Sequence, residues 1–258
     1  MAITGEFNTD TNALKKRIHS HEQFGSTDIN SWIFQNMELI KGISIVDLGC
    51  GTGKQTIPMS EIVGKDGSIF AIDISQEALN TLSLQAEQRG LSSRVNLLCS
   101  ELDKANDYLV ENTYDRVLSS FSLYYSQDPL EVIKIIWRSL KNNGIFFFCG
   151  PSKDNNAELK TFQNKIKRID DSHLSGGVLF MEQIGQSLVE EVFGTMEIFY
   201  FENKLKFDSY EALYNYWSSY NLYDKEIENR FITETKIHFN NNSVFETTKR
   251  VLGIKTKK

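Results

Sequence analysis

Three glycines at alternate positions mark the segment of this chain best suited to hold a ligand. The segment reads Val46-Asp47-Leu48-Gly49-Cys50-Gly51-Thr52-Gly53. Glycine lets the backbone turn sharply and leaves room for a ligand against the main chain. An apolar, β-branched run precedes the segment at residues 43–46, and a helical pattern follows it. A turn of this type, at the carboxyl end of the first strand of an open α/β sheet, predicts a nucleoside-binding site.

The spacing of the glycines discriminates between nucleoside ligands. The dinucleotide fingerprint is Gly-x-Gly-x-x-Gly, with the pyrophosphate on the helix N-terminus. Counted from Gly49, its third glycine would fall at a position that Lys54 occupies. Asp47, just before the glycines, would also repel a pyrophosphate, whereas it suits a ligand with an ammonium group and a sulfonium. The pattern disfavours a nicotinamide dinucleotide, and a tight turn without a ligand is the remaining alternative.

A second carboxylate is expected at the same edge of the sheet. Asp73 ends the apolar run of residues 68–72, which predicts the second strand. A carboxylate there can accept hydrogen bonds from both hydroxyls of a ribose, because it projects next to the first turn. An isolated aspartate at a strand end more often caps a helix or forms a turn. Together with the glycine loop, the ribose role is the favoured interpretation.

Four segments resemble the class I S-adenosylmethionine-dependent methyltransferases, of the type that includes the UbiE-like and small-molecule enzymes. They are the glycine loop at 47–53, the second-strand segment 70–75, the fourth-strand segment 114–120 and the turn 140–144. The resemblance covers roughly residues 40–150 and is specific for fold and cofactor, but only weakly for the substrate. It implies S-adenosylmethionine as cofactor and a Rossmann-like α/β fold. That fold is a seven-stranded, mostly parallel sheet with helices on both faces and an antiparallel last strand.

The resemblance also implies cofactor-binding roles at the matching positions. The loop glycines would pack against the methionine part of the cofactor, and Asp73 would hold its ribose. Glu101 would accept a hydrogen bond from the adenine amino group, although the family more often has aspartate there and an exposed charged turn is an equal alternative. Ser119 would offer its carbonyl to the cofactor's amino group. The full expected set is Asp47, Gly49, Cys50, Gly51, Gly53, Asp73, Ile74, Glu101, Leu102 and Ser119.

The residues expected on the acceptor side are less specific. A sulfonium donor is already activated, so the enzyme aligns the reactants, excludes water and, for some acceptors, removes a proton. Tyr124 and Tyr125 follow the fourth strand, where the resembling enzymes face their active site, and core packing is a comparable alternative. His21 is the first candidate for a base, with His19 behind it, although a surface histidine is the commoner outcome. No metal site is expected.

Short apolar runs alternate with helical patterns over the first 150 residues, which indicates a parallel α/β sheet. Gly144 is expected to end the helix at 131–140 in a left-handed conformation. Beyond Pro151 we expect, in chain order, a helix at 181–193, a strand at 196–207, a helical stretch at 208–239 and a strand at 244–254. One methyltransferase domain is expected over 1–258. Its parts are an N-terminal cap segment (1–36), a cofactor-binding core (37–150) and a C-terminal part with a helical substrate cap (151–258).

Composition restricts the partners. The formal net charge of −6 and the pI near 5.4 argue against nucleic acid. Three cysteines without Cys-x-x-Cys spacing argue against disulfides and zinc. No apolar run reaches the roughly 20 residues of a membrane span, and the first residues lack the apolar core of a secretory signal. These features favour a cytoplasmic protein, monomeric or homodimeric, without a membrane.

The favoured function is enzymatic methyl transfer to the oxygen, nitrogen or carbon of a small molecule by direct displacement. Three alternatives remain on the same fold. They are a non-catalytic S-adenosylmethionine-binding module, a methyltransferase that acts on a macromolecule, and an aminopropyltransferase. The last would need additional acids after the fourth strand, where the sequence has Ser119-Ser120-Phe121-Ser122.

Overall fold

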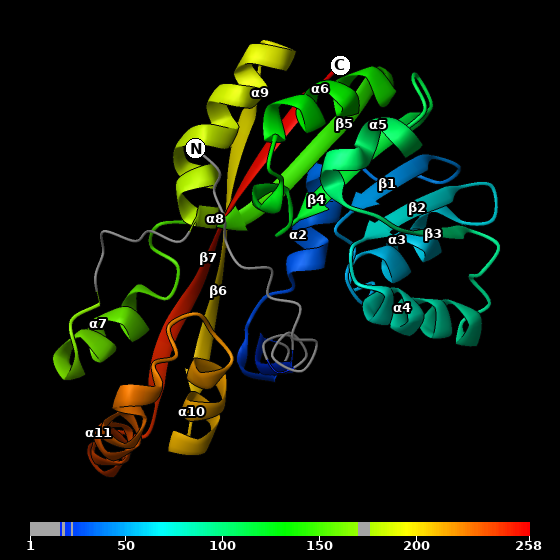
Figure 1. Ribbon diagram of the computed structural model, residues 1–258. Helices are drawn as coiled ribbons and strands as arrows, with labels where there is room; N and C mark the ends of the chain where they lie inside the picture. The colour runs from blue at the N-terminus through cyan, green and yellow to red at the C-terminus, as the bar shows by residue number, and fades with distance from the viewer. Residues whose placement is uncertain (1–15, 17–18, 22, 170–175) are drawn as a thin grey trace.

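The computed structural model describes all residues except 1–15, 17–18, 22 and 170–175 (Figure 1). Within the described residues, one sheet has the strand order β3-β2-β1-β4-β5-β7-β6. Its strands are β1 (Ser44–Leu48), β2 (Ser68–Asp73), β3 (Val95–Cys99), β4 (Tyr114–Ser120), β5 (Leu140–Pro151), β6 (Glu197–Phe207) and β7 (Phe245–Lys257). Neighbouring strands from β3 to β5 are parallel, and β7 is antiparallel to β5 and to β6. The expected Rossmann-like, mostly parallel sheet with an antiparallel last strand is confirmed.

Helices cover both faces of the sheet. The first face carries α2 (Ile29–Asn36), α3 (Thr56–Val63) and α4 (Gln76–Gln88). The second face carries α5 (Ala105–Tyr108), α6 (Pro129–Ser139), α8 (Gly176–Leu179), the single π-helical turn η3 (Phe180–Ile184) and α9 (Gly185–Phe193). Successive phenylalanines of β5 serve the two cores in turn, because side chains alternate along a strand. Phe147 packs with the first group, and Phe146 and Phe148 pack with the second.

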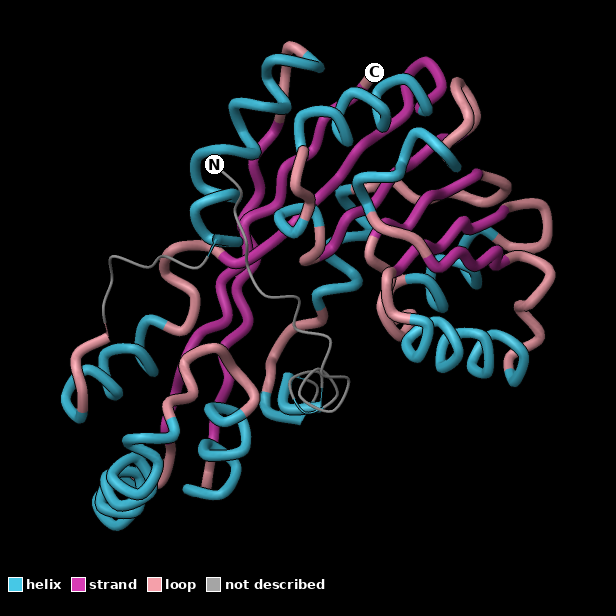
Figure 2. Tube along the Cα trace, in the orientation of Figure 1, coloured by secondary structure: helices cyan, strands magenta, loops and turns pink. Residues whose placement is uncertain are grey.

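The last two strands continue beyond the end of β5 as a two-stranded ribbon. β5 makes its last pair at Pro151↔Val251, whereas β6 and β7 remain paired to Phe207↔Phe245. Figures 1 and 2 show this ribbon leaving the rest of the sheet, with α7 (Ala157–Ile166), α10 (Tyr210–Ser218) and α11 (Glu228–Asn241) around its far end. These helices and the ribbon share their own apolar core, which we call the distal cluster.

Two local expectations were wrong. The helical stretch expected at 208–239 is divided into α10, the short 3₁₀ helix η4 (Lys225–Ile227) and α11. The Asp224 side chain accepts a hydrogen bond from the Glu226 backbone N–H (2.9 Å), and such a polar cap starts a new helical turn. Gly144 does not end α6 in a left-handed conformation. Asn143 has the positive φ instead, at 65°, which asparagine tolerates better than most residues.

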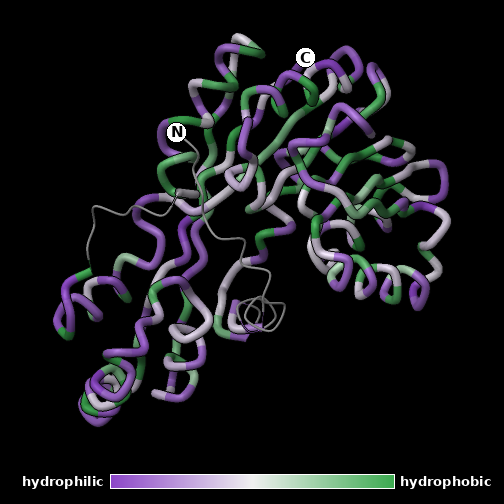
Figure 3. Tube along the Cα trace, in the orientation of Figure 1, coloured by the Kyte–Doolittle hydropathy of each residue, from purple (hydrophilic) through white to green (hydrophobic). Residues whose placement is uncertain are grey.

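Hydropathy follows this layering. Figure 3 shows apolar residues concentrated along the central strands and alternating with polar residues along the surrounding helices, as amphipathic helices require. None of the helices in the described ranges combines the length and the apolar character needed to cross a membrane.

Candidate cofactor and active site

The glycine loop connects the end of β1 to the start of α3. Gly49, Gly51 and Gly53 all have positive φ, at 75°, 55° and 88°. A Cβ atom on Gly49 would lie 2.2 Å from Ser122 Cβ, and one on Gly53 would lie 2.3 Å from Leu82 Cδ1. Glycine is therefore needed at Gly49 and Gly53 for two reasons. The backbone there is left-handed, and neighbouring side chains leave no room for a Cβ atom.

Side chains from three other parts of the chain donate hydrogen bonds to backbone carbonyls in this loop and at its two ends. The contacts are Ser122 Oγ to the Leu48 carbonyl (2.5 Å), Gln85 Nε2 to the Thr52 carbonyl (3.1 Å) and Asn30 Nδ2 to the Lys54 carbonyl (3.0 Å). Asn30 also accepts a hydrogen bond from Gln55 Nε2 at 3.0 Å, so its amide is used in both directions. The loop is thus fixed before any ligand arrives, which lowers the entropic cost of binding.

Asp73 lies at the end of β2 and is joined to the glycine loop. Its Oδ2 accepts from the Gly51 backbone N–H (2.7 Å), and its Oδ1 accepts from the Ser75 backbone N–H (2.9 Å). Each oxygen keeps a lone pair, because an ionised carboxylate can accept about four hydrogen bonds. Asp73 is only half-buried. The residue can therefore accept two further donors spaced like the hydroxyls of a ribose, which fits S-adenosylmethionine.

Asp47 lies beneath the loop and is almost completely buried, with 1% exposure. Its Oδ2 accepts from Thr56 Oγ1 at 2.6 Å, which connects the end of β1 to the first turn of α3. Burial raises the pKa of Asp47 to about 7, and the nearby Asp73 charge adds to this, while the Thr56 hydrogen bond opposes it. Burial and the two aspartates also raise the pKa of the Cys50 thiol well above its usual value, so this thiol stays protonated.

The residues predicted to contact adenine lie beside Asp73. The Ser100 backbone N–H donates to the Asp73 carbonyl (3.1 Å), which brings the turn after β3 next to the end of β2. The Glu101 side chain is 54% exposed and lies 3.8 Å from Lys104 Nζ. Ile74 is 42% exposed, and Leu102 is half-buried against the second core. An exposed apolar side chain and a carboxylate are thus available at this edge, and their adenine roles stay predictions.

Ser119 lies in β4 under the glycine loop and is fully buried. Its Oγ lies 2.6 Å from Ser122 Oγ, which in turn holds the end of β1. The hydroxyl of Ser119 therefore belongs to the support of the loop, and the predicted role of its carbonyl stays a prediction.

The three candidate catalytic residues fall into two places. Tyr124 and Tyr125 form the 3₁₀ turn η2 (Leu123–Tyr125) after β4, with ring centroids 4.7 Å apart. The His21 ring lies edge-on to Tyr216 of α10 at 5.6 Å, and its Nε2 lies 3.3 Å from Tyr220 Oη. The tyrosines thus lie at the carboxyl edge of the sheet. His21 instead contacts Tyr216 and Tyr220, which belong to α10 and the segment after it. The catalytic roles of all three residues stay predictions.

Three residues that hold the loop were not predicted from the sequence, namely Asn30, Gln85 and Ser122. Ser122 lies only three residues after Ser119 in a serine-rich segment, and a buried hydroxyl pair was a signal available there. Asn30 and Gln85 are polar residues of helices, and no spacing relates them to the glycine loop. Their contribution is visible only after the helices pack.

The chain matches the family model of a methyltransferase domain over residues 39–208. A demethylmenaquinone methyltransferase of Shouchella clausii is 30% identical over 110 residues, which cover 43% of this chain and 46% of that protein. The chain spans only part of the length of such relatives. The matched segment covers 19% of a bifunctional biotin-biosynthesis protein of Teredinibacter turnerae and 57% of a probable cobalt-precorrin-6B C(15)-methyltransferase of Saccharolobus solfataricus.

Solved structures show the same fold. A SAM-dependent methyltransferase of Aquifex aeolicus aligns with a TM-score of 0.55 at 21% identity, over 75% of this chain and 91% of that one. The [4+2]-cyclase SpnF aligns with a TM-score of 0.55 at 18% identity, over 88% of this chain and 79% of that one.

The sheet order, the glycine loop and the carboxylate at the end of β2 define the class I S-adenosylmethionine-dependent methyltransferase fold. The family match extends over more than half of the chain, and the chain belongs to the methyltransferase-domain family. S-adenosylmethionine is the cofactor that this family and fold imply, and the recognition made from the sequence is confirmed.

Proposed function

We propose that the protein transfers the methyl group of S-adenosylmethionine to a small-molecule acceptor, at oxygen, nitrogen or carbon, by direct displacement. The observation that carries the proposal is the contact between Asp73 and the Gly51 backbone at the carboxyl edge of the sheet. It supports a nucleoside site with a fixed loop and a half-buried carboxylate that can accept further hydrogen bonds.

The proposed roles follow from the contacts of each residue. Asp73 holds the ribose, and the glycine loop lies along the methionine part, with Glu101, Ile74 and Leu102 around the adenine. When bound, S-adenosylmethionine supplies an activated methyl group on a positively charged sulfur. Tyr124 and Tyr125 form the wall that aligns the acceptor and excludes water. His21 is the proposed base for acceptors that must lose a proton.

Two features support a small acceptor. The net charge is −6, and nucleic-acid binding needs a strongly basic face. The relative from Shouchella clausii is named for a quinone substrate. The fold alone does not determine the reaction, since the similar structure of SpnF is named as a cyclase. Methyl transfer therefore needs a direct test.

The first test is calorimetric titration of the purified protein with S-adenosylmethionine, S-adenosylhomocysteine and NAD. We expect micromolar-range binding of the two sulfur nucleosides and none of NAD. Asp73→Ala should weaken S-adenosylhomocysteine binding by about 1–3 kcal/mol, because charge-assisted hydrogen bonds are lost.

The matched control is Asp66→Ala, an exposed aspartate of the turn before β2. Unchanged affinity in folded Asp73→Ala protein would remove the ribose assignment. Absence of binding by either sulfur nucleoside would remove the proposed function. Transfer of a labelled methyl group to members of an acceptor panel then tests turnover.

A further inference from the structure

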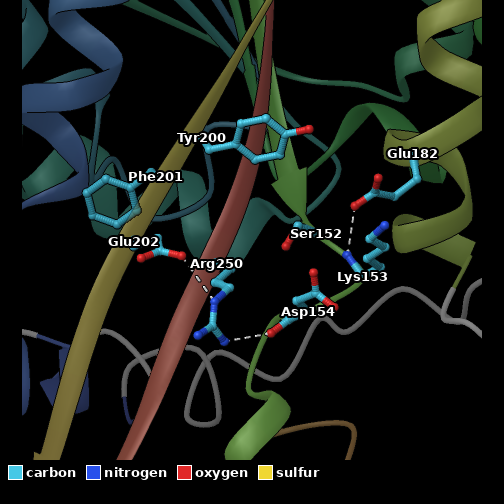
Figure 4. A pocket seen from close by; sticks show the side chains of 8 residues that line it. All are labelled: Ser152, Lys153, Asp154, Glu182, Tyr200, Phe201, Glu202 and Arg250. Atoms are coloured by element: carbon cyan, nitrogen blue, oxygen red, sulfur yellow. Dashed lines mark hydrogen bonds and ion pairs between the residues drawn. The ribbon is translucent and has the colours of Figure 1, made fainter.

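A cavity opens where β5 ends and β7 continues without it. β5 makes its last pair at Pro151, and Ser152 then leads the chain away from the sheet. The cavity has a volume of about 360 Å³ (Figure 4), which lies in the range of small-molecule sites. Its lining residues are Ser152, Lys153, Asp154, Glu182, Tyr200, Phe201, Glu202 and Arg250.

The Arg250 guanidinium on one side of the cavity is already neutralised. Its Nη2 lies 2.9 Å from Glu158 Oε1, and its Nε lies 3.2 Å from Glu202 Oε1. Its Nη1 donates to the Asp154 backbone carbonyl at 3.0 Å. Arg250 therefore forms a fixed wall of the cavity, and its charge is not available to a ligand.

Other charges in the cavity are not paired within the described residues. In the part of the chain that the structure describes, Lys153 Nζ forms no ion pair and the Asp154 carboxylate accepts no hydrogen bond. Glu182 uses one oxygen, Oε1, to accept from the Lys153 backbone N–H at 2.8 Å. Figure 4 shows the Glu182 carboxylate and the Lys153 side chain on the same side of the cavity.

An aromatic ring completes the cavity. Tyr200 extends from β6 over it and is 68% exposed. A bare cation would gain from this ring and from the carboxylates but would be repelled by Lys153, and a bare anion would be repelled by Asp154 and Glu182. A ligand with both charges satisfies both sets of groups, so the walls discriminate against ligands with one charge.

The cavity adjoins the place of the two candidate tyrosines. A Cβ on Gly150 would lie 2.7 Å from Met181 Cγ and 3.0 Å from Tyr124 Cε1. Gly150 precedes Ser152 by two residues, and Met181 directly precedes Glu182. The cavity therefore begins two residues after Gly150, which packs closely against Tyr124.

We propose that this cavity binds a small zwitterion in which an ammonium and a carboxylate belong to one molecule. The ammonium lies between the Tyr200 ring and the carboxylates of Glu182 and Asp154, and the carboxylate lies at Lys153 Nζ. The bound group is the charged end of the methyl acceptor, and this last step alone rests on the proposed function.

The test compares the affinity of a zwitterion with the affinities of a cation and an anion that each carry one of its two charges. Glycine betaine, tetramethylammonium and acetate are each titrated into the full chain, followed by NMR or calorimetry, with and without S-adenosylhomocysteine. We expect betaine to bind at least about tenfold more tightly than either half, since two charge contacts act in one molecule. Tetramethylammonium or acetate binding as tightly as betaine, or no saturable betaine binding, overturns the proposal.

Two charge-removing variants assign the contacts. Glu182→Gln retains an oxygen that can accept from the Lys153 backbone, so the local fold is preserved. Glu182→Gln and Lys153→Met should each weaken betaine binding roughly tenfold. Lys153→Met should not weaken tetramethylammonium binding, because it removes a repulsive charge.

The controls are Glu191→Gln and Lys65→Met, which remove the same charges at exposed positions outside the cavity. Betaine affinity that is equal in the cavity variants and these controls overturns the assignment. Failure of S-adenosylhomocysteine to bind the unaltered protein contradicts the proposed function instead, and the betaine titration still decides the cavity.

Discussion

The side chain of Asp47 is buried, and burial disfavours the ionised form of a carboxyl group. Its environment is nearly closed to water, and the hydrogen bond from Thr56 only partly compensates for the lost hydration. With a pKa of about 7, this side chain is ionised in only part of the molecules at neutral pH. Asp47 therefore stabilises the fold through its hydrogen bond with Thr56 and destabilises it when its buried carboxyl group is ionised.

This environment predicts a pH dependence of stability. The folded pKa of about 7 lies above the unfolded value of 3.8, so the unfolded chain releases its proton first as the pH rises. The contribution of Asp47 to stability is complete below about pH 4 and is lost between about pH 4 and 7, by on the order of 4 kcal/mol. Urea unfolding between pH 4 and 8 measures this loss.

Asp47→Asn supplies the comparison, because its amide oxygen can still accept from Thr56. The variant should lose less stability over the same pH range, and the difference between the two proteins should stop growing above about pH 7. Parallel pH profiles of the two proteins would show that the carboxyl group is not the cause.

At the scale of elements, the support of the glycine loop comes from parts of the chain far apart in sequence. α2 is capped by Asp28, whose side chain accepts from the backbone N–H groups of Asn30 and Ser31. Asn30 then reaches the Lys54 carbonyl and Gln55 at the end of the loop. The position of α2 is thereby coupled to the loop that is proposed to hold the methionine part.

Asn30→Ala should weaken S-adenosylhomocysteine binding by about 0.5–1.5 kcal/mol, because the loop loses two hydrogen bonds that fix its end. Calorimetry measures the change, and thermal unfolding reports whether the fold is kept. Asn80→Ala, an exposed asparagine of α4, is the control. Equal affinities of the two variants would show that α2 does not position the loop.

In the whole molecule, the described residues form two apolar cores against the sheet and a separate apolar cluster away from it. The sheet is covered on both faces, and the distal cluster lies at the far end of the β6–β7 ribbon. Trp217 and Phe231 stack within the distal cluster with ring centroids 3.9 Å apart. His21 contacts this part through Tyr216 and Tyr220, so the predicted base would follow any movement of it.

Phe231→Ala should therefore loosen the distal cluster without affecting the cofactor site. A fully buried aromatic side chain lost to alanine costs about 3–5 kcal/mol, and Phe231→Leu should cost less because it retains more volume. Hydrogen exchange should accelerate in α7, α10 and α11, while the amides of β1 and β4 remain protected. S-adenosylhomocysteine affinity should stay within about twofold. If β1 and β4 lost as much protection as α7, α10 and α11, the chain would unfold as one cooperative unit, and this prediction would be wrong.

Local sequence patterns were sufficient to predict the parallel core, the glycine loop and the carboxylate at the end of β2. These features depend on short-range rules, because strand runs, glycine turns and the residue after a strand are read from a few neighbouring positions. The first five strands were predicted on that basis, whereas the antiparallel direction of the last strand was implied by the family resemblance. Asp73 faces the loop because the carboxyl ends of adjacent parallel strands lie together.

No sequence pattern predicted which side chains hold the loop or where the candidate base lies, because both depend on contacts between distant segments. Asn30 and Lys54 are 24 residues apart, and Ser122 and Leu48 are 74 apart. Such contacts depend on the angles at which helices pack on the sheet, and no local pattern records those angles. The same reason applies to the zwitterion cavity, because its walls come from β6, β7, η3 and the chain after β5. These elements meet only because the ribbon continues where β5 ends.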